Sequence, residues 1–344
     1  MTPIMSTARP VPRINRQFKL AARPVGLPKE SDFTLVDAPA PSLAEGQALV
    51  KTVYLSVDPY MRGRITGVRT YADPVNIGDV MEAGAVGQVG ESKSPALAPG
   101  DFVLGRWGWQ EYAAVDAKTV RKLDPKLAPV STALGVLGMP GMTAYFGFLE
   151  ICKPQPGETV LVSGAGGAVG SLVGQIARIK GCRVVGIAGT EDKIDWLLKE
   201  LGFDSAFNYK TTADYGEKLK ELCPNGIDCY FDNVGGSITD AVFPRMNTFG
   251  RISVCGQISQ YNLKQPEQCP RLLPYVLVKQ LKVEGFIVTR FQSRFGEGIA
   301  QMAQWIKEGK LKYREQVVEG FENTPKAFIA MLQGENTGKM LVKV

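Results

Sequence analysis

The stretch VLVSGAGGAVGSLVGQIA, residues 160–177, decides the fold of the larger part of the chain. It begins with a short apolar run typical of a buried strand, turns through a cluster of glycines, and continues with apolar residues at helical spacing. Backbone N–H groups of such a turn and of the following helix N-terminus favour a phosphate. A strand, a glycine turn and a helix in this order predict the first unit of a dinucleotide-binding fold.

The glycine spacing departs from the strict G-x-G-x-x-G pattern. Ala165 stands where the first glycine is expected, and Gly167 and Gly170 occupy the other two places. A short glycine pattern also occurs in ordinary tight turns. The preceding strand, the following helix and Gly174 one helical turn later favour the dinucleotide interpretation.

The rest of the chain divides into a β-rich part and a part where strands and helices alternate. The β-rich part predicts a compact barrel-like domain, with strands at 17–21, 48–55, 86–89, 102–104 and 112–115. The alternating part predicts a parallel doubly wound sheet, with strands at 160–163, 183–187, 205–208, 229–232 and 250–255 and helices at 168–180, 192–201, 213–222 and 236–247. A short mixed stretch follows, with a helix at 296–309, the run 315–319 and a strand at 340–344.

Charge and composition exclude several classes of partner. The net charge is +6, but the excess of Lys and Arg lies in residues 1–29, which contain no acidic residue. The remainder is balanced, so no domain-scale basic surface for nucleic acid is expected. Residues 127–149 carry no charge, yet their prolines and glycines interrupt them, so we expect buried helices and no membrane span. The six cysteines are scattered, which favours a reduced, cytoplasmic chain in which they are buried small side chains.

The sequence contains no histidine. This excludes hydrolases with a Ser-His-Asp or Cys-His arrangement and zinc sites with histidine ligands. Four-cysteine zinc binding in the β-rich part is also excluded, because the first cysteine is Cys152. We therefore expect no metal, and a general acid must be a tyrosine, a lysine, a carboxyl group, a ribose hydroxyl or water.

The second strand of the alternating part indicates which nicotinamide nucleotide is bound. In NAD-binding folds an acidic residue at the tip of this strand holds the ribose 2′-hydroxyl. Here the tip is Gly189, with no carboxylate, which favours the 2′-phosphate of NADPH. Lys193 can reach that phosphate and Tyr209 can add a hydroxyl, although Lys193 could also be a solvated surface lysine. The acidic pair Glu191 and Asp192 argues against the assignment.

Several longer motifs carry a resemblance to a known family. The chain resembles the zinc-independent medium-chain dehydrogenases/reductases, and within them it is most similar to NADPH-dependent double-bond reductases, the prostaglandin/leukotriene and curcumin reductases. The similarity begins near Asn15, so we expect an ordinary short tail before it and not a transit peptide. The motifs are VDPYMRGR at 57–64, LGMPGMTAY at 137–145, GAVGS at 167–171, FDNVGG at 231–236, CGQISQYN at 255–262 and GK at 338–339.

The resemblance implies a two-domain α/β fold. Residues 1–137 and 311–344 would form a GroES-like β-rich substrate domain, and residues 138–310 an inserted Rossmann domain with a doubly wound parallel sheet that binds NADPH. The cleft between the two would hold the nicotinamide. The segment at 286–288, which itself predicts a strand, implies a homodimer, because this neighbourhood pairs the sheets of two subunits in the family.

The resemblance also assigns residues to the cofactor. A tyrosine that some relatives carry in the segment 275–278 is replaced by Val278, so a role for that tyrosine does not transfer. The implied NADPH-site residues are Gly167, Ala168, Val169, Gly170, Lys193, Tyr209, Asn233, Cys255, Gly256, Ile258, Ser259, Tyr261, Phe286, Ile287, Val288 and Asn336.

The implied reaction is reduction of a C=C bond in an α,β-unsaturated ketone or aldehyde. Hydride reaches the β-carbon, donors near the carbonyl oxygen stabilise the enolate, and the α-carbon is protonated. Tyr60, Tyr261 and Tyr71 are the candidates for carbonyl contact, proton supply or walls of the substrate slot, or they are half-buried aromatic residues with a solvated hydroxyl. Arg62 and Arg64 brace the loop or face solvent.

Two alternatives remain open from the sequence. The first is a quinone reductase, which uses the same cofactor without zinc. The second is an NADPH-binding protein without catalytic activity. These two alternatives and the double-bond reductase are distinguished by comparing turnover of an enone with turnover of a quinone and by measuring NADPH binding separately.

Overall fold

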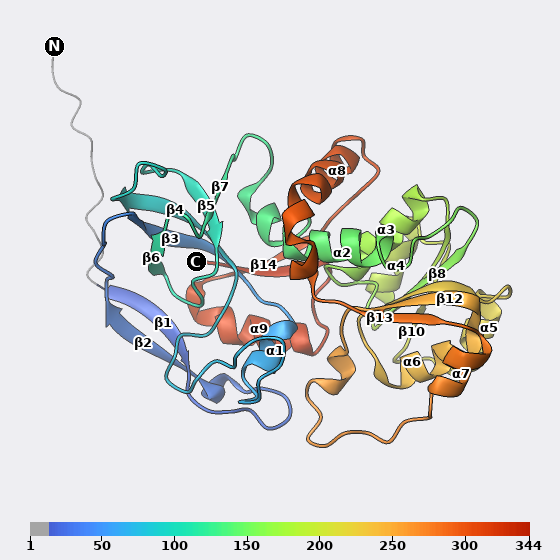
Figure 1. Cartoon of the computed structure of the whole chain (residues 1–344). Coiled ribbons are helices and arrows are strands. Elements are labelled where there is room, and N and C mark those ends of the chain that lie inside the picture. Colours follow the sequence, from blue (N-terminus) through green and yellow to red (C-terminus); the bar gives the residue numbers. More distant parts are fainter. Residues whose placement is uncertain (1–13) are drawn as a thin grey trace, which may run out of the picture. The chain divides into compact units, whose positions relative to one another are not determined.

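The computed structural model describes residues 14–344, so the expected tail before the first strand lies outside the described residues. The chain forms two compact units (Figure 1). The first contains residues 14–134 together with Val317–Met331 and Leu341–Val344. The second contains Gly135–Gln316 and Leu332–Met340.

The second unit is built on a six-stranded sheet in the order β10-β9-β8-β11-β12-β13. Every neighbouring pair is parallel, and the order reverses beside β8, as in a doubly wound dinucleotide-binding sheet. The strands are β8 (Thr159–Val162), β9 (Arg183–Ala188), β10 (Ser205–Asn208), β11 (Ile227–Asp232), β12 (Met246–Val254) and β13 (Lys282–Gly285). The prediction of a parallel doubly wound sheet is therefore confirmed.

Alternating side chains of these strands enter two separate cores. Val160 and Val162 of β8 pack on one face with α2, α3, α4 and α8, while Leu161 packs on the other face with α5 and α6. Both faces are apolar because helices cover both sides of a parallel sheet. The helices are α2 (Met139–Leu149), α3 (Gly170–Ile179), α4 (Glu191–Lys199), α5 (Tyr215–Leu222), α6 (Gly236–Val242), α7 (Leu273–Val278) and α8 (Phe295–Lys307).

Several predicted elements of this unit were wrong in extent, among them the strand predicted at 250–255, which is β12 at Met246–Val254. The helix predicted at 236–247 ends at Val242, and a 3-10 turn at Phe243–Arg245 leads directly into β12. Pro244 in that turn has no N–H to continue the helix. The strand predicted at 286–288 lies instead at Lys282–Gly285, because this earlier segment supplies the register with β12.

The first unit contains a seven-stranded sheet and a separate two-stranded sheet. The C-terminal strand β15 joins the larger sheet, where Leu341 pairs antiparallel with Ser56 of β3. Five rings pack in the core of this unit: Phe18, Phe33, Trp109, Phe321 and Phe328. The elements are β1 (Ile14–Leu20), β2 (Phe33–Pro39), β3 (Gln47–Ser56), α1 (Tyr60–Arg64), β4 (Ala85–Ser92), β5 (Phe102–Gly105), β6 (Tyr112–Asp116), β7 (Arg121–Leu123), β14 (Glu315–Glu319), α9 (Thr324–Leu332) and β15 (Lys339–Lys343).

Two expectations from composition can be compared with the structure. Among residues 14–344, no helix has the length and apolarity to cross a bilayer. Four of the six cysteines are buried, Cys255 is half-buried, and Cys269 is exposed on an irregular segment. The expectation that all six are buried was therefore wrong for Cys269.

Candidate functional site

The glycine turn after β8 is closed by backbone contacts that leave no room for a Cβ at Gly170. Gly164 adopts φ +59°, a left-handed conformation that glycine reaches without strain, and its carbonyl accepts a hydrogen bond of 3.1 Å from the N–H of Gly167. A Cβ on Gly170 would overlap the Gly164 carbonyl and lie 2.8 Å from Cα of Ala165. Val169, which caps α3, offers no side-chain acceptor to the first N–H groups of the helix. The N–H groups of Ser171 and Leu172 already donate to the carbonyls of Gly167 and Val169 at 3.1 Å, so the fit to a pyrophosphate rests on the side-chain-free backbone ahead of the helix.

Two side chains from neighbouring elements are candidates for the 2′-phosphate end of the cofactor: Tyr209, which follows β10, and Lys193 on α4. Tyr209 lies against Gly189, where a Cβ would be 2.8 Å from the ring. Lys193 is only 8% exposed, and its ammonium donates a hydrogen bond of 2.6 Å to the carbonyl of Gly334. Burial and the neighbouring Lys210 lower the pKa of Lys193. The alternative of a solvated surface lysine was therefore wrong.

This lysine provides a test of whether the chain fits a phosphorylated cofactor. A buried ammonium is costly unless it is paired with an anion, and within residues 14–344 the ammonium of Lys193 donates only to the neutral carbonyl of Gly334. Of the two acids nearby in sequence, Glu191 accepts a hydrogen bond of 2.8 Å from Asn208, and Asp192 is exposed. A 2′-phosphate would supply the missing negative charge, so the residues fit NADPH.

The carboxyl ends of β11 and β12 are tied to the same edge of the sheet. Asn233 donates through its amide to the carbonyl of Ser163 at 2.7 Å, and its N–H donates to the Ser163 hydroxyl at 2.9 Å. The N–H groups of Cys255 and Gly256 donate to the backbone carbonyl of Asp232 at 2.8 and 3.1 Å. The loops after both strands therefore have fixed positions beside the glycine turn.

A buried carboxylate holds this edge together, and the sequence did not reveal it. Asp232 is 1% exposed and accepts hydrogen bonds from the hydroxyls of Ser163, Tyr230 and Thr239 at 3.0, 2.8 and 2.7 Å. The N–H groups of Val234 and Gly235 donate to it as well, at 3.0 and 2.9 Å. In a sequence, an acidic residue directly after a strand is compatible with a ligand-binding role and with an ordinary turn. The sequence therefore contains no signal that predicts the buried role of Asp232.

Tyr261 lies in the loop after β12. Its hydroxyl accepts a hydrogen bond of 3.3 Å from the N–H of Gln257, so its own proton can be directed to another acceptor. Burial raises the pKa of Tyr261, and the nearby Cys255 and Asp232 raise it further. The hydroxyl is therefore protonated at neutral pH and can donate.

The remaining implied cofactor residues lie in two segments and a short turn. Ile258 and Ser259 form the turn after β12, where their N–H groups donate to the carbonyls of Asn233 and Val234 at 3.3 and 3.1 Å. Phe286 is a core side chain whose ring fills the space above Gly147 of α2, whereas Ile287 is 42% exposed. Val288 packs against the core beneath α2, and Asn336 donates to the carbonyl of Gly338 at 2.8 Å.

Tyr60 and Tyr71 belong to the first unit, where Arg106 lies near both of them. Tyr60 begins α1, and the guanidinium of Arg106 lies 5.8 Å from the centre of its ring. Glu82 pairs with Arg106 and, at 2.6 Å, with Arg64. Burial raises the pKa of Tyr60, and the nearby Asp58 adds to this effect, so its hydroxyl stays protonated. Tyr71 is 58% exposed and lies near both Tyr60 and Arg106.

The arginines of the 57–64 motif are structural. Arg62 is buried and donates to the carbonyl of Gly26 at 2.9 Å, while Arg64 holds Glu82. The expectation that they brace the loop is confirmed, and the alternative that they face solvent was wrong.

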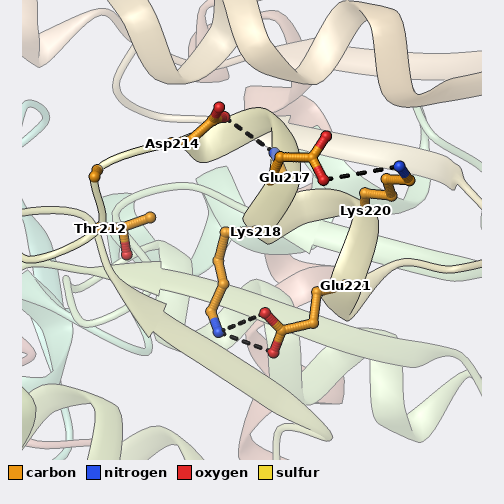
Figure 2. Close-up of a pocket in the computed structure, with 7 residues that line it drawn as sticks. Thr212, Asp214, Glu217, Lys218, Lys220 and Glu221 are labelled. Carbon is orange, nitrogen blue, oxygen red and sulfur yellow. Dashed lines mark hydrogen bonds and ion pairs between the residues drawn. The ribbon is translucent and has the colours of Figure 1, made fainter.

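A shallow hollow on α5 lies outside the predicted site. Its charged side chains are paired with one another, as Figure 2 shows: Lys218 with Glu221 at 2.9 Å and Lys220 with Glu217 at 3.7 Å. Asp214 accepts a hydrogen bond of 3.0 Å from the N–H of Glu217 and caps the helix. These ion pairs and this cap stabilise α5, and we assign no ligand to the hollow. Within residues 14–344, no group of three His, Cys, Asp or Glu side chains is arranged to hold a metal ion.

The strand order, the glycine turn and the buried lysine together define a dinucleotide-binding oxidoreductase. Two family models match the chain. One, described as the N-terminal domain of oxidoreductase, covers residues 16–123, and the other, described as zinc-binding dehydrogenase, covers residues 168–305. The chain belongs to the medium-chain dehydrogenase/reductase superfamily, among its double-bond reductases.

Three similar proteins have a named function or a bound cofactor. The NADPH-dependent curcumin reductase of Escherichia coli is 45% identical over 96% of this chain and 97% of its own length. The NADP-dependent 2-alkenal reductase of Nicotiana tabacum is 43% identical, with the same coverage of both chains. The crystal structure of CurA from Vibrio vulnificus in complex with NADPH superposes with a TM-score of 0.92 at 47% identity, over 96% of this chain and 99% of that one.

Proposed function

We propose that this protein reduces the C=C bond of α,β-unsaturated ketones and aldehydes with NADPH. The observation that carries the proposal is the likeness over 96% of the chain to the curcumin and 2-alkenal reductases, since a 2-alkenal contains an alkene conjugated to a carbonyl. We assign residues 138–310 to cofactor binding, and residues 1–137 and 311–344 to the substrate. The protein would act in the cytoplasm, where its free cysteines stay reduced, and cell fractionation would test this.

The chain's own residues divide the work of binding the cofactor. The glycine turn at 164–170 receives the pyrophosphate, and Lys193 and Tyr209 receive the 2′-phosphate end. Asn233 and the loop 255–261 lie at the ends of the neighbouring strands, where open parallel sheets bind ligands. NADPH bound in this way supplies a hydride for the β-carbon of the substrate.

The tyrosines act on the carbonyl end of the substrate. As the β-carbon accepts the hydride, the carbonyl oxygen gains the charge of an enolate, and a positioned hydroxyl stabilises that charge by about 3 kcal/mol. Tyr60 and Tyr261 are both kept protonated by burial, so each can donate in this way. A proton from a hydroxyl or from water is then added at the α-carbon and completes the reduction. Tyr71 forms part of the exposed wall beside Tyr60.

The reaction is tested by following NADPH oxidation at 340 nm with a panel of substrates. We expect turnover with 2-alkenals, a prostanoid enone and curcumin, and at least tenfold lower kcat/KM with a simple quinone. Higher kcat/KM for the quinone would replace the proposal with quinone reduction. NADPH binding without turnover of any of the four would indicate a protein without catalytic activity.

The cofactor preference is tested by reversing the charge of Lys193. Lys193→Glu is expected to raise KM for NADPH by about a hundredfold and KM for NADH by less than about threefold, because only NADPH carries the repelled phosphate. Lys199→Glu is the matched control, since Lys199 lies on the same helix but is 71% exposed. If Lys193→Glu raised KM for NADPH and for NADH by the same factor, Lys193 would not be the residue that binds the 2′-phosphate.

We also propose a homodimer formed through the β13 edge of the sheet. β13 is the last strand on this side, so one row of its backbone groups is unpaired within the sheet. Apolar side chains around it are exposed: Leu273 and Leu277 by 77% and 78%, and Val283 by 43%. Light scattering should give twice the chain mass of 37.3 kDa, and a monomer at micromolar concentration would contradict the proposal.

A further inference from the structure

A short segment near the C-terminus crosses the dinucleotide-binding turn. We call residues 333–338 the strap. The N–H of Gly338 donates to the carbonyl of Gly166 at 2.8 Å, and Gly338 also bridges to Gly167. The N–H of Thr337 donates to the side chain of Gln316 at 3.1 Å. The strap is therefore bound directly to the glycine turn.

The strap also determines where the ammonium of Lys193 lies. The carbonyl of Gly334 accepts one of the three ammonium protons at 2.6 Å, which leaves two for another acceptor. The helix that carries Lys193 is tied down by a second contact, because Arg314 lies 4.8 Å above the ring of Trp196 and pairs with Glu200 at 3.0 Å. The carbonyl of Arg314 accepts a hydrogen bond of 2.9 Å from Lys339, which directly follows the strap.

Gly334 can present its carbonyl in this direction because of its backbone conformation. Its φ is +74°, and no heavy atom of the described residues lies within 4 Å of the position of a Cβ. A side chain would therefore meet no steric obstacle, but a β-branched residue cannot keep a positive φ. The constraint at this position is the direction of the carbonyl and not the available space.

We propose that the strap is a specificity element for the 2′-phosphate, in which the carbonyl of Gly334 is the positioning group for Lys193. The inference rests on the proposed use of NADPH. The carbonyl of Gly334 holds the ammonium of Lys193 near the tip of β9, and the two remaining ammonium protons are available to an anion. The affinity that a nucleotide gains from its 2′-phosphate therefore depends on the strap. A bound 2′-phosphate in turn fixes the ammonium and thereby holds the strap against the glycine turn.

The test compares two nucleotides and two matched glycines. The probes are adenosine 2′,5′-bisphosphate and 5′-AMP, which differ in the 2′-phosphate, and their Kd values are measured by calorimetry. Gly334→Val turns the carbonyl away. Gly309→Val is the control, because Gly309 has φ +69°, an equally open Cβ position and the same place after a helix.

We expect Gly334→Val to weaken bisphosphate binding by about tenfold and 5′-AMP binding by less than about twofold. Gly309→Val should change neither by more than about twofold. In a Lys193→Met background, Gly334→Val should have no further effect on the bisphosphate, since the group that it positions is gone. Equal losses in the two valine variants, or a loss that persists without Lys193, would overturn the inference.

Hydrogen exchange of the unmodified protein provides a second test that needs no variant. The bisphosphate should slow exchange at the amides of Thr337 and Gly338, and 5′-AMP should not. Identical exchange with both nucleotides would also overturn the inference. If the unmodified protein bound both nucleotides equally, the proposed use of NADPH would fail first and the inference with it.

Discussion

Replacing both Tyr60 and Tyr261 by phenylalanine is expected to lower kcat for an enone by at least about a hundredfold, because removal of one oxyanion donor alone typically costs that much. The Kd for NADPH should change by less than about threefold, since neither change removes a charge or closes the glycine turn. Both hydroxyls are protonated at neutral pH, because burial raises their pKa. Single-turnover rates and NADPH titrations separate the two quantities.

The control for this double variant removes two hydroxyls elsewhere. Tyr112 and Tyr313 are half-buried tyrosines outside the proposed site, one in each unit. Tyr112→Phe combined with Tyr313→Phe should keep kcat within about twofold. Unchanged enone turnover in the Tyr60→Phe, Tyr261→Phe protein would show that neither hydroxyl takes part in the reaction.

Gly170→Ala is expected to disrupt both the fold of the second unit and its cofactor site. The new Cβ would overlap the Gly164 carbonyl and press on Ala165, and these are backbone groups that no rotamer change can move. Overpacking of this kind costs about 3 kcal/mol of unfolding free energy. The displaced turn should also weaken NADPH binding by more than about tenfold, which denaturant unfolding and calorimetry would measure.

Gly296→Ala is the matched control for this change. Gly296 lies in the first turn of α8, where no heavy atom from residues 14–344 is within 4 Å of a Cβ position and φ is not positive. Alanine there should leave stability unchanged or raise it by about 0.5 kcal/mol, because it restricts the unfolded chain. If both variants were equally stable and bound NADPH equally well, the close packing at Gly170 would contribute neither to stability nor to cofactor binding.

Patterns of residues close in sequence were sufficient to predict those helices, strands and turns that depend mainly on neighbouring residues. The alternation of strands and helices from residue 157 predicted the parallel sheet, and Ser205–Asn208 was predicted with its observed bounds. The glycine turn was identified because only small residues allow its backbone contacts. The absence of histidine was read directly from composition, and it removed whole classes of chemistry without any structure.

Features that depend on distant residues could not be predicted in the same way. The apolar run at 286–288 looks like a strand by itself, but pairing with β12 selects Lys282–Gly285, and the ring of Phe286 is used to fill the space above Gly147. Asp232 becomes a buried centre of hydrogen bonds only when Ser163, which directly follows the neighbouring strand β8, reaches it. The sequence gives no sign of such contacts, since they join residues about 70 positions apart.

The sequence by itself determined the order of the elements, the glycine turn, the missing acid at the tip of β9 and the choice of Lys193 as the cation beside it. Only the tertiary structure decided that this lysine is buried and held by Gly334, a residue 141 positions away. The physical reason is that helix and turn signals come from neighbouring residues, whereas burial and the direction of a backbone carbonyl are set by whichever distant segment packs there.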